Sequence, residues 1–279
     1  MSTLKVGDYN NLKVNRSSDF GLYLSYDEGE VLLPNRYISD ELKEGSEVEV
    51  FVYHDSEGRL VAVREQPFAK VGDFAALKVK DVTDIGAFLD IGLAKDLFVP
   101  LKEQHRRMQE GKTYLVKVML DPRTGRMIGV SKIGAFLEKE NIDLEEGQEV
   151  DLMVYELTDL GFMCLVNETY AGMLYRNEVF SKLEIGSKLT GYVKKLREDN
   201  KIDLSERPLG FKGLEGQEAS IVDRLKKSPK GFLPFNDRSS PEEIRSEFEM
   251  SKKSFKKLIG ILYKQRIIEI DQKGIKLVE

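Results

Sequence analysis

Residues 84–92 read DIGAFLDIG, a short segment in which the side chains alternate between two faces and two glycines punctuate the run. Successive side chains of a β-strand point to opposite faces of the sheet. If Ala87 and Leu89 face a core, then Phe88 and Asp90 face solvent. A strand with a phenylalanine on its solvent face either covers a neighbouring surface or binds a ligand.

The features around this segment occur three times along the chain. Each copy opens with a glycine, and a second glycine follows fourteen residues later at the start of an alternating strand. These pairs are Gly7 and Gly21, Gly72 and Gly86, and Gly147 and Gly161. A short strand, a third glycine and a hairpin complete each copy, so the chain contains an internal repeat.

Each copy holds about five short strands separated by turn residues. Five antiparallel strands of this size close into a small barrel, which leaves no strand edge exposed. We therefore expect three tandem five-stranded OB-fold barrels over residues 1–66, 67–138 and 139–210.

The last part of the chain, residues 211–279, changes from strand to helix periodicity. An amphipathic helix is expected over residues 218–228. Residues 240–248, SPEEIRSEF, combine a serine cap, a proline at the first helical position and a glutamate three residues after the serine. Ser251 is expected to cap the next helix, whose apolar face is formed by Phe255, Leu258, Ile259 and Leu262. With a closing hairpin, these elements predict a winged-helix domain, so the fold class is mainly β with a small α+β C-terminal domain.

Charge and cysteine content limit the compartment and the partners. The net charge of the 279 residues is −5, but residues 217–279 hold 14 basic and 10 acidic residues, a local balance of +4. The remainder, with 29 basic and 38 acidic residues, carries −9. A single cysteine, no secretory signal and no apolar run of about 20 residues favour a cytoplasmic protein without a membrane partner.

The barrel repeats resemble S1 domains, the RNA-binding OB barrels named for a ribosomal protein. The most specific segments are IGAFLDIG at 85–92, GRMIGVSK at 125–132 and KIDLSER at 201–207. Three S1-like barrels followed by a winged helix resemble the conserved virulence factor B family of Gram-positive bacteria. This resemblance implies a cytosolic, non-enzymatic RNA-binding protein that influences gene expression, including that of virulence genes.

The S1 resemblance also implies which residues contact single-stranded RNA. Exposed aromatic rings stack on bases, and neighbouring basic side chains meet the phosphates. The candidate RNA-binding residues are Phe20, Tyr23, Arg59, Phe88, Arg126, Tyr175, Lys194, Lys195, Arg197 and Lys201. The third barrel has Met163 where the others have Tyr23 and Phe88. We therefore expect the first two barrels to supply most of the stacking and the third barrel more of the electrostatic contact.

Other interpretations of these features stay open. Phe88 packs against a neighbouring barrel in one of them. In the winged helix, four lysines opposite the apolar face are possible nucleic-acid contacts, on the helix that enters the DNA major groove in DNA-binding relatives of this fold. These lysines are Lys253, Lys256, Lys257 and Lys264. The competing functions are a transcriptional regulator that binds duplex DNA and an interaction protein that docks on the ribosome or RNA polymerase.

Catalytic signals are weak in this sequence. His54 and His105 lie in different repeats, and neither has a second ligand at metal-binding spacing. Cys164 alternates toward the interior of its strand, as a core residue does. No phosphate-binding loop, nucleophile elbow or zinc-protease motif occurs. We expect no catalytic residues, no metal site and no cofactor.

Overall fold

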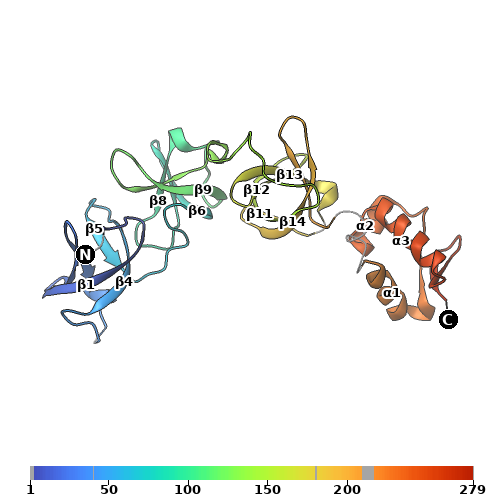
Figure 1. The fold of residues 1–279 in the computed structure, drawn as a ribbon, viewed down its shortest axis with the longest axis horizontal. Helices are drawn as coiled ribbons and strands as arrows, with labels where there is room; N and C mark the ends of the chain where they lie inside the picture. The colour runs from blue at the N-terminus through green and yellow to red at the C-terminus, as the bar shows by residue number, and fades with distance from the viewer. Residues whose placement is uncertain (1–2, 40, 180, 209–216, 279) are drawn as a thin grey trace. The chain divides into compact units, whose positions relative to one another are not determined.

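The computed structural model describes residues 3–39, 41–179, 181–208 and 217–278. The chain divides into two compact units, Met1–Phe136 and Leu137–Glu279, which are treated separately below. The first unit holds two closed five-stranded barrels, and the second holds a third such barrel and a helical C-terminal domain (Figure 1). The predicted fold class is therefore confirmed. The exact domain boundaries stay a prediction, and the last of them, at 210/211, lies outside the described residues.

Barrel 1 consists of five strands in the order β1-β2-β3-β5-β4, closed by pairing of β4 with β1. The β3–β5 pair is parallel, and the other pairs are antiparallel. Its elements are β1 (Asp8–Ser18), β2 (Gly21–Tyr26), β3 (Gly29–Pro34), the 3₁₀ turn η1 (Asn35–Tyr37), β4 (Glu47–His54) and β5 (Leu60–Val63).

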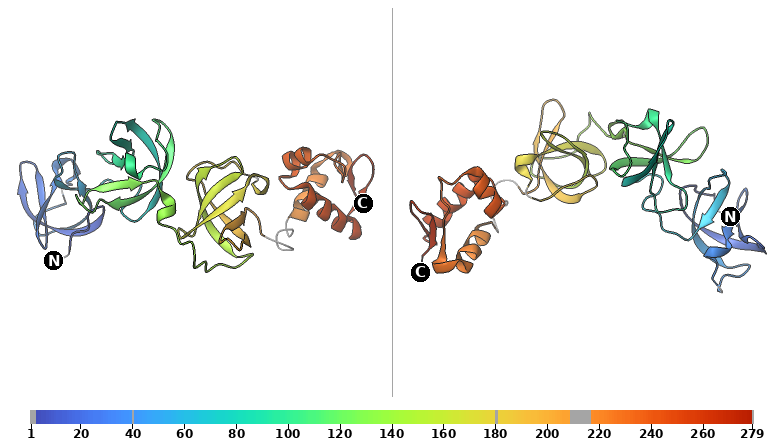
Figure 2. Two further views of the ribbon diagram at one scale, coloured as in Figure 1. Left: turned by 90° about the horizontal axis from the view of Figure 1, so that it is seen from above. Right: turned by 180° about the vertical axis from the view of Figure 1, so that it is seen from behind.

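Barrels 2 and 3 repeat this topology in the same chain order (Figure 2). Barrel 2 comprises β6 (Phe74–Val82), β7 (Gly86–Leu89), β8 (Leu97–Pro100), η2 (Leu101–Glu103), β9 (Thr113–Leu120) and β10 (Met127–Val130), and η3 (Ile133–Ala135) follows it. Barrel 3 comprises β11 (Glu149–Leu157), β12 (Gly161–Val166), β13 (Tyr170–Tyr175), η4 (Arg176–Glu178), β14 (Lys188–Leu196) and β15 (Ile202–Ser205).

The second glycine of each repeat is required by close backbone contact. It opens the second strand of each barrel and faces the end of the third strand. A Cβ atom added to Gly21, Gly86 or Gly161 would lie 2.1, 2.4 or 2.3 Å from the carbonyl oxygen of Leu33, Val99 or Leu174, respectively. No larger residue fits without moving the strand, which explains why the repeat keeps glycine here.

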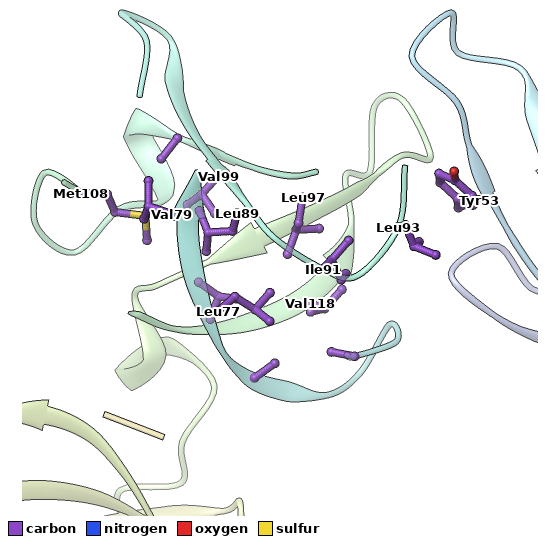
Figure 3. Packing of buried hydrophobic residues seen from close by; sticks show 14 of the residues in the cluster. Tyr53, Leu77, Val79, Leu89, Ile91, Leu93, Leu97, Val99, Met108 and Val118 are labelled. Carbon is purple, nitrogen blue, oxygen red and sulfur yellow. The ribbon is translucent and has the colours of Figure 1, made fainter. Parts of the chain in front are cut away.

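The core of barrel 2 confirms the alternation predicted for DIGAFLDIG. Ala87 and Leu89 are fully buried, whereas Phe88 lies half-buried on the outer face. The same apolar cluster continues onto barrel 1 within this unit, where Tyr53 lies close to Leu93 (Figure 3). Barrel 2 therefore covers outward-facing aromatic side chains of barrel 1.

The C-terminal domain has the predicted winged-helix order. Its elements are α1 (Gln217–Lys227), η5 (Pro229–Gly231), β16 (Phe232–Leu233), α2 (Pro241–Phe248), α3 (Lys252–Lys264), β17 (Ile268–Ile270) and β18 (Ile275–Leu277). Ser240 and Glu243 form the expected reciprocal cap of α2, and the Ser251 side chain accepts a hydrogen bond from the Ser254 backbone. The four predicted apolar residues of α3 are all buried. Among the described helices, none is long and apolar enough to cross a membrane.

Candidate nucleic-acid interface

A β-bulge in the first strand of each barrel changes which side chains face outward. The strand register shifts between Val14 and Arg16 in β1, and at the corresponding places in β6 and β11. Leu12 and Val14 are buried, so uninterrupted alternation would also turn Arg16 inward. The extra residue reverses the alternation and brings Arg16 opposite Tyr23 on the outer face.

Directly paired residues then form a row across the five strands of each barrel, because side chains opposite each other share one face of the sheet. Outer row 1 is Arg16, Tyr23, Leu32, Val61 and Tyr53. Outer row 2 is Asp81, Phe88, Phe98, Ile128 and Met119. Outer row 3 is Glu156, Met163, Met173, Asp203 and Lys195.

The two predicted aromatic contacts of barrel 1 both reach the surface but differ in exposure. Phe20 is 73% exposed at the tip of the β1–β2 turn. Tyr23 is half-buried, and the Arg16 guanidinium carbon lies 3.7 Å from its ring centroid. Arg59 is exposed, but its guanidinium pairs with Asp55 at 2.8 Å and Glu57 at 2.7 Å. Its charge is therefore largely neutralised within its own turn.

Barrel 2 carries an aromatic pair on outer row 2. The Phe88 ring lies 5.1 Å from the Phe98 ring, with 38° between their planes. Both rings are half-buried, and Ile85, which directly precedes β7, is 67% exposed. The sequence analysis missed Phe98, although the pairing of Gly86 with Pro100 places Phe98 opposite Phe88 and could have revealed it.

Arg126, the predicted basic contact of barrel 2, is exposed at the turn between β9 and β10. It reaches barrel 1, since a Cβ atom added to Gly58 would lie 2.2 Å from its Nη2. Burial, and then the nearby Arg126 charge, lower the pKa of His54 and of Lys95. The Lys95 ammonium donates hydrogen bonds to the carbonyl oxygens of His54 at 3.0 Å and Asp55 at 2.7 Å, which joins the two barrels.

Barrel 3 has methionines in place of the aromatic rings, since Met163 faces Met173 on outer row 3. Tyr175, which is half-buried, accepts a hydrogen bond at 2.6 Å from Arg197. The Arg197 Nε atom lies 3.0 Å from the Asp203 carboxylate.

The other predicted basic residues of barrel 3 do not form one cluster. Lys194 pairs with Glu178 at 2.5 Å, and Lys201 pairs with Asp199 at 2.6 Å. Lys195 is exposed in outer row 3. Most of the cationic charge expected on this face is therefore balanced by carboxylates.

On the winged helix, the four predicted lysines of α3 are all exposed. Lys256 lies 3.9 Å from the Asp237 carboxylate, a loose ion pair. Tyr263, which the sequence analysis did not single out, is 56% exposed near the end of the same helix. Helical spacing from Lys256 to Tyr263 puts them on one face and could have identified it.

Among the described residues, no group of three or more His, Cys, Asp and Glu side chains could hold a metal ion. Cys164 is fully buried, and burial raises the pKa of its thiol to about 12. As predicted from its place in the strand, it is a core residue.

These features define a class of protein, a nucleic-acid-binding chain of tandem S1 domains with a winged helix. Residues 6–64 match the S1 domain model, residues 69–159 match the S1 RNA binding domain model, and residues 219–277 match the CvfB-like winged helix domain model. The second match extends from barrel 2 into the first strand of barrel 3. The families matched are known for nucleic-acid binding and regulation rather than for catalysis.

The resemblance to the conserved virulence factor B family is confirmed, since the chain has homologues of that name over most of its length. Conserved virulence factor B of Staphylococcus epidermidis and of Staphylococcus aureus are each 28% identical over 247 residues, which cover 86% of this chain and 83% or 82% of theirs. "Uncharacterized protein YitL" of Bacillus subtilis is 28% identical over 272 residues, 94% of this chain and 90% of its own. A crystal structure of a multidomain protein with nucleic acid binding domains from Streptococcus pneumoniae is 24% identical, with a TM-score of 0.45 and 98% of each chain covered.

Proposed function

We propose that this chain is a non-enzymatic cytoplasmic protein that binds single-stranded RNA on the outer rows of its barrels. The observation that carries the proposal is the aromatic pair of Phe88 and Phe98 on outer row 2, within the barrel that resembles an S1 domain most closely. An aromatic platform of this kind accepts unpaired bases of any sequence, at about 1–3 kcal/mol for each stacked base.

Several weak barrels in series suit a flexible single strand. Each barrel offers a small site, and the covalent connection raises the effective concentration of the next site once the first is occupied. The phosphate contacts would come from Arg126, from Lys195 and from Arg197, which lies beside Tyr175. Because the chain is acidic overall, RNA binding would depend on these local groups and not on the net charge.

The cellular role we infer is post-transcriptional regulation of gene expression, including that of virulence genes. It rests on the family resemblance and on the names of the staphylococcal homologues. We expect deletion of the gene to change the abundance or decay of specific transcripts. The wild-type gene should reverse this change, whereas a variant that does not bind RNA should not. Unchanged transcript decay would contradict this part of the proposal.

A second candidate function is duplex DNA binding through α3, favoured by its exposed lysines and Tyr263. The two functions separate in one titration. The full chain is titrated with labelled single-stranded RNA and with duplex DNA at several salt concentrations, and the variant Lys253→Ala/Lys264→Ala is compared with Phe88→Ala. We expect RNA binding that Phe88→Ala weakens more. Binding confined to duplex DNA, and lost only in the lysine variant, would exclude the RNA-binding proposal.

A further inference from the structure

Outer row 1 differs from the other two rows at its first position. Arg16 stands there, whereas the equivalent residues, which follow the same bulge, are Asp81 in barrel 2 and Glu156 in barrel 3. At this position of the outer row, barrel 1 therefore has a cation, whereas barrels 2 and 3 have a carboxylate. In addition, Arg16 lies over the ring of Tyr23 and covers the surface on which a base would otherwise stack.

The guanidinium of Arg16 is held in a fixed orientation from the side. The Glu30 carboxylate accepts two hydrogen bonds from it, at 2.9 Å from Nε and 2.7 Å from Nη2. The Asn15 amide donates to the same carboxylate at 2.5 Å. The hydrogen bond from Arg16, followed by that from Asn15, lowers the pKa of Glu30. The carboxylate therefore stays ionised near neutral pH and keeps its hydrogen bonds to Arg16.

The side chain of Arg16 remains half exposed, at 50%, despite its contacts with Tyr23 and Glu30. A guanidinium is planar and stacks on π systems, including nucleobases. The Tyr23 ring centroid lies 3.7 Å from the guanidinium carbon, and Glu30 accepts hydrogen bonds from Nε and Nη2. The exposed half of the side chain stays accessible to a ligand.

We propose that Arg16 is the surface on which barrel 1 stacks an unpaired nucleobase, in a layered arrangement of Tyr23, the Arg16 guanidinium and the base. Tyr23 then supports the base through Arg16, and Glu30 is a positioning residue. The inference rests on the proposed function, since it specifies how barrel 1 holds RNA. It differs from the expectation that Tyr23 itself contacts the base.

The opposite role is a lid. In that case Arg16 shields Tyr23 and must leave before a base can bind, so the Arg16–Glu30 contact opposes RNA binding. The two roles predict opposite effects of removing the side chain. A layered stack loses affinity when Arg16 is replaced by alanine, whereas a lid gains it.

The experiment is an equilibrium titration of the full chain with a labelled single-stranded RNA of about 20 nucleotides, long enough for several OB barrels. The variants are Arg16→Ala, Arg16→Lys, Tyr23→Phe and Glu30→Gln. Lys117→Ala is the matched control, because it removes one positive charge and a cation–π contact of 3.9 Å over Phe74 elsewhere in the unit. Thermal unfolding of each variant verifies that barrel 1 stays folded.

We expect Arg16→Ala to weaken binding about fivefold or more, the lower end for one stacked base. Arg16→Lys should weaken it similarly, because lysine keeps the charge and lacks the plane. Tyr23→Phe should bind as the wild type, Glu30→Gln should lose about twofold to threefold, and Lys117→Ala should change little. Because Glu30 already balances the charge of Arg16, the salt dependence of binding should stay the same in Arg16→Ala.

The following results would overturn the inference. Arg16→Ala that binds as tightly as the wild type, or more tightly, makes Arg16 a bystander or a lid. If Arg16→Lys binds RNA as tightly as the wild type, or if the salt slope falls by about one in Arg16→Ala, Arg16 is a phosphate contact. If one of these results is obtained while Phe88→Ala, measured in the same assay, weakens binding, the proposed function stands and this inference alone fails. If the wild type does not bind RNA, both fail.

Discussion

Barrels 2 and 3 have interiors of the same design and differ on one outer face. Both place a glycine against the carbonyl of the neighbouring strand, and both carry a bulge at the same point of their first strand. On the outer row, however, barrel 2 pairs Phe88 with Phe98, and barrel 3 pairs Met163 with Met173. The positions that close the barrel are therefore constrained in every copy, whereas the outer row is free to differ, as expected where ligand contacts are made.

The largest effect is expected for Gly86→Ala, which tests the close contact between the second and third strands of barrel 2. The added Cβ atom would lie 2.4 Å from the Val99 carbonyl oxygen and 2.5 Å from the Phe98 ring. We expect barrel 2 to lose about 2 kcal/mol of stability or more, as in other overpacked sites. Calorimetry of the full chain would measure this loss as a lower unfolding temperature of barrel 2. The matched control is Gly134→Ala, where an added Cβ has no neighbour within 4 Å. Equal melting of both variants would contradict the close contact.

The next largest effect concerns the outer rows themselves. Phe88→Ala removes an aromatic surface that we propose stacks on a base, and it should weaken single-stranded RNA binding about tenfold. Met163→Ala at the equivalent position of barrel 3 should change binding by less than about twofold. Fluorescence titration with one RNA measures both variants. Similar losses from both substitutions would remove the distinction between the two barrels.

Those two rows also explain how much could be predicted from the sequence. The glycine spacing occurs three times, and each glycine meets a backbone constraint that acts locally, so the barrels were predicted correctly. Phe88 was placed on the outer face because alternation holds along β7. Arg16 was missed because alternation from Leu12 and Val14 assigns it to the core, and the bulge that reverses this depends on strand pairing.

The charges were harder to predict for a different reason. Arg59 and Lys201 share a register in the repeats, but each forms an ion pair with a carboxylate of its own turn, Asp55 and Asp199. Long exposed side chains choose partners over short distances, and spacing along the chain does not specify which. Whether these residues contact RNA stays a prediction, and their pairing means that RNA would have to compete with a carboxylate.

A substitution that adds an aromatic ring to barrel 3 tests the same difference in the opposite direction. Met163→Phe gives barrel 3 the aromatic side chain that barrel 2 has at the same register. We expect RNA affinity to rise about twofold to fivefold, less than a full stacking contribution because Met173 still occupies the neighbouring position. The same titration measures it, and Met173→Ala serves as a control for altered packing on this face. Unchanged affinity would show that barrel 3 does not hold a base at this point.

A smaller effect is expected at the first position of outer row 2. Asp81 is exposed opposite Phe88, where its charge repels a phosphate that follows a stacked base. Asp81→Asn should strengthen RNA binding about twofold at low salt, and the gain should shrink at high salt as screening increases. Titrations at two salt concentrations test this. A gain that is independent of salt would point to a packing change and not to charge.

The smallest expected effect is an absence of reaction that tests the register of barrel 3. Cys164 follows Met163 directly, and it is fully buried. Burial raises the pKa of its thiol to about 12, so at pH 8 the thiolate that reacts with iodoacetamide is nearly absent, and the sulfur is also shielded. Native protein should resist alkylation and become reactive in denaturant, as mass spectrometry would show. A shift of β12 by one residue would exchange the two faces and expose Cys164 in place of Met163. Rapid alkylation of the folded chain would therefore contradict the register on which outer row 3, and its contrast with outer row 2, depends.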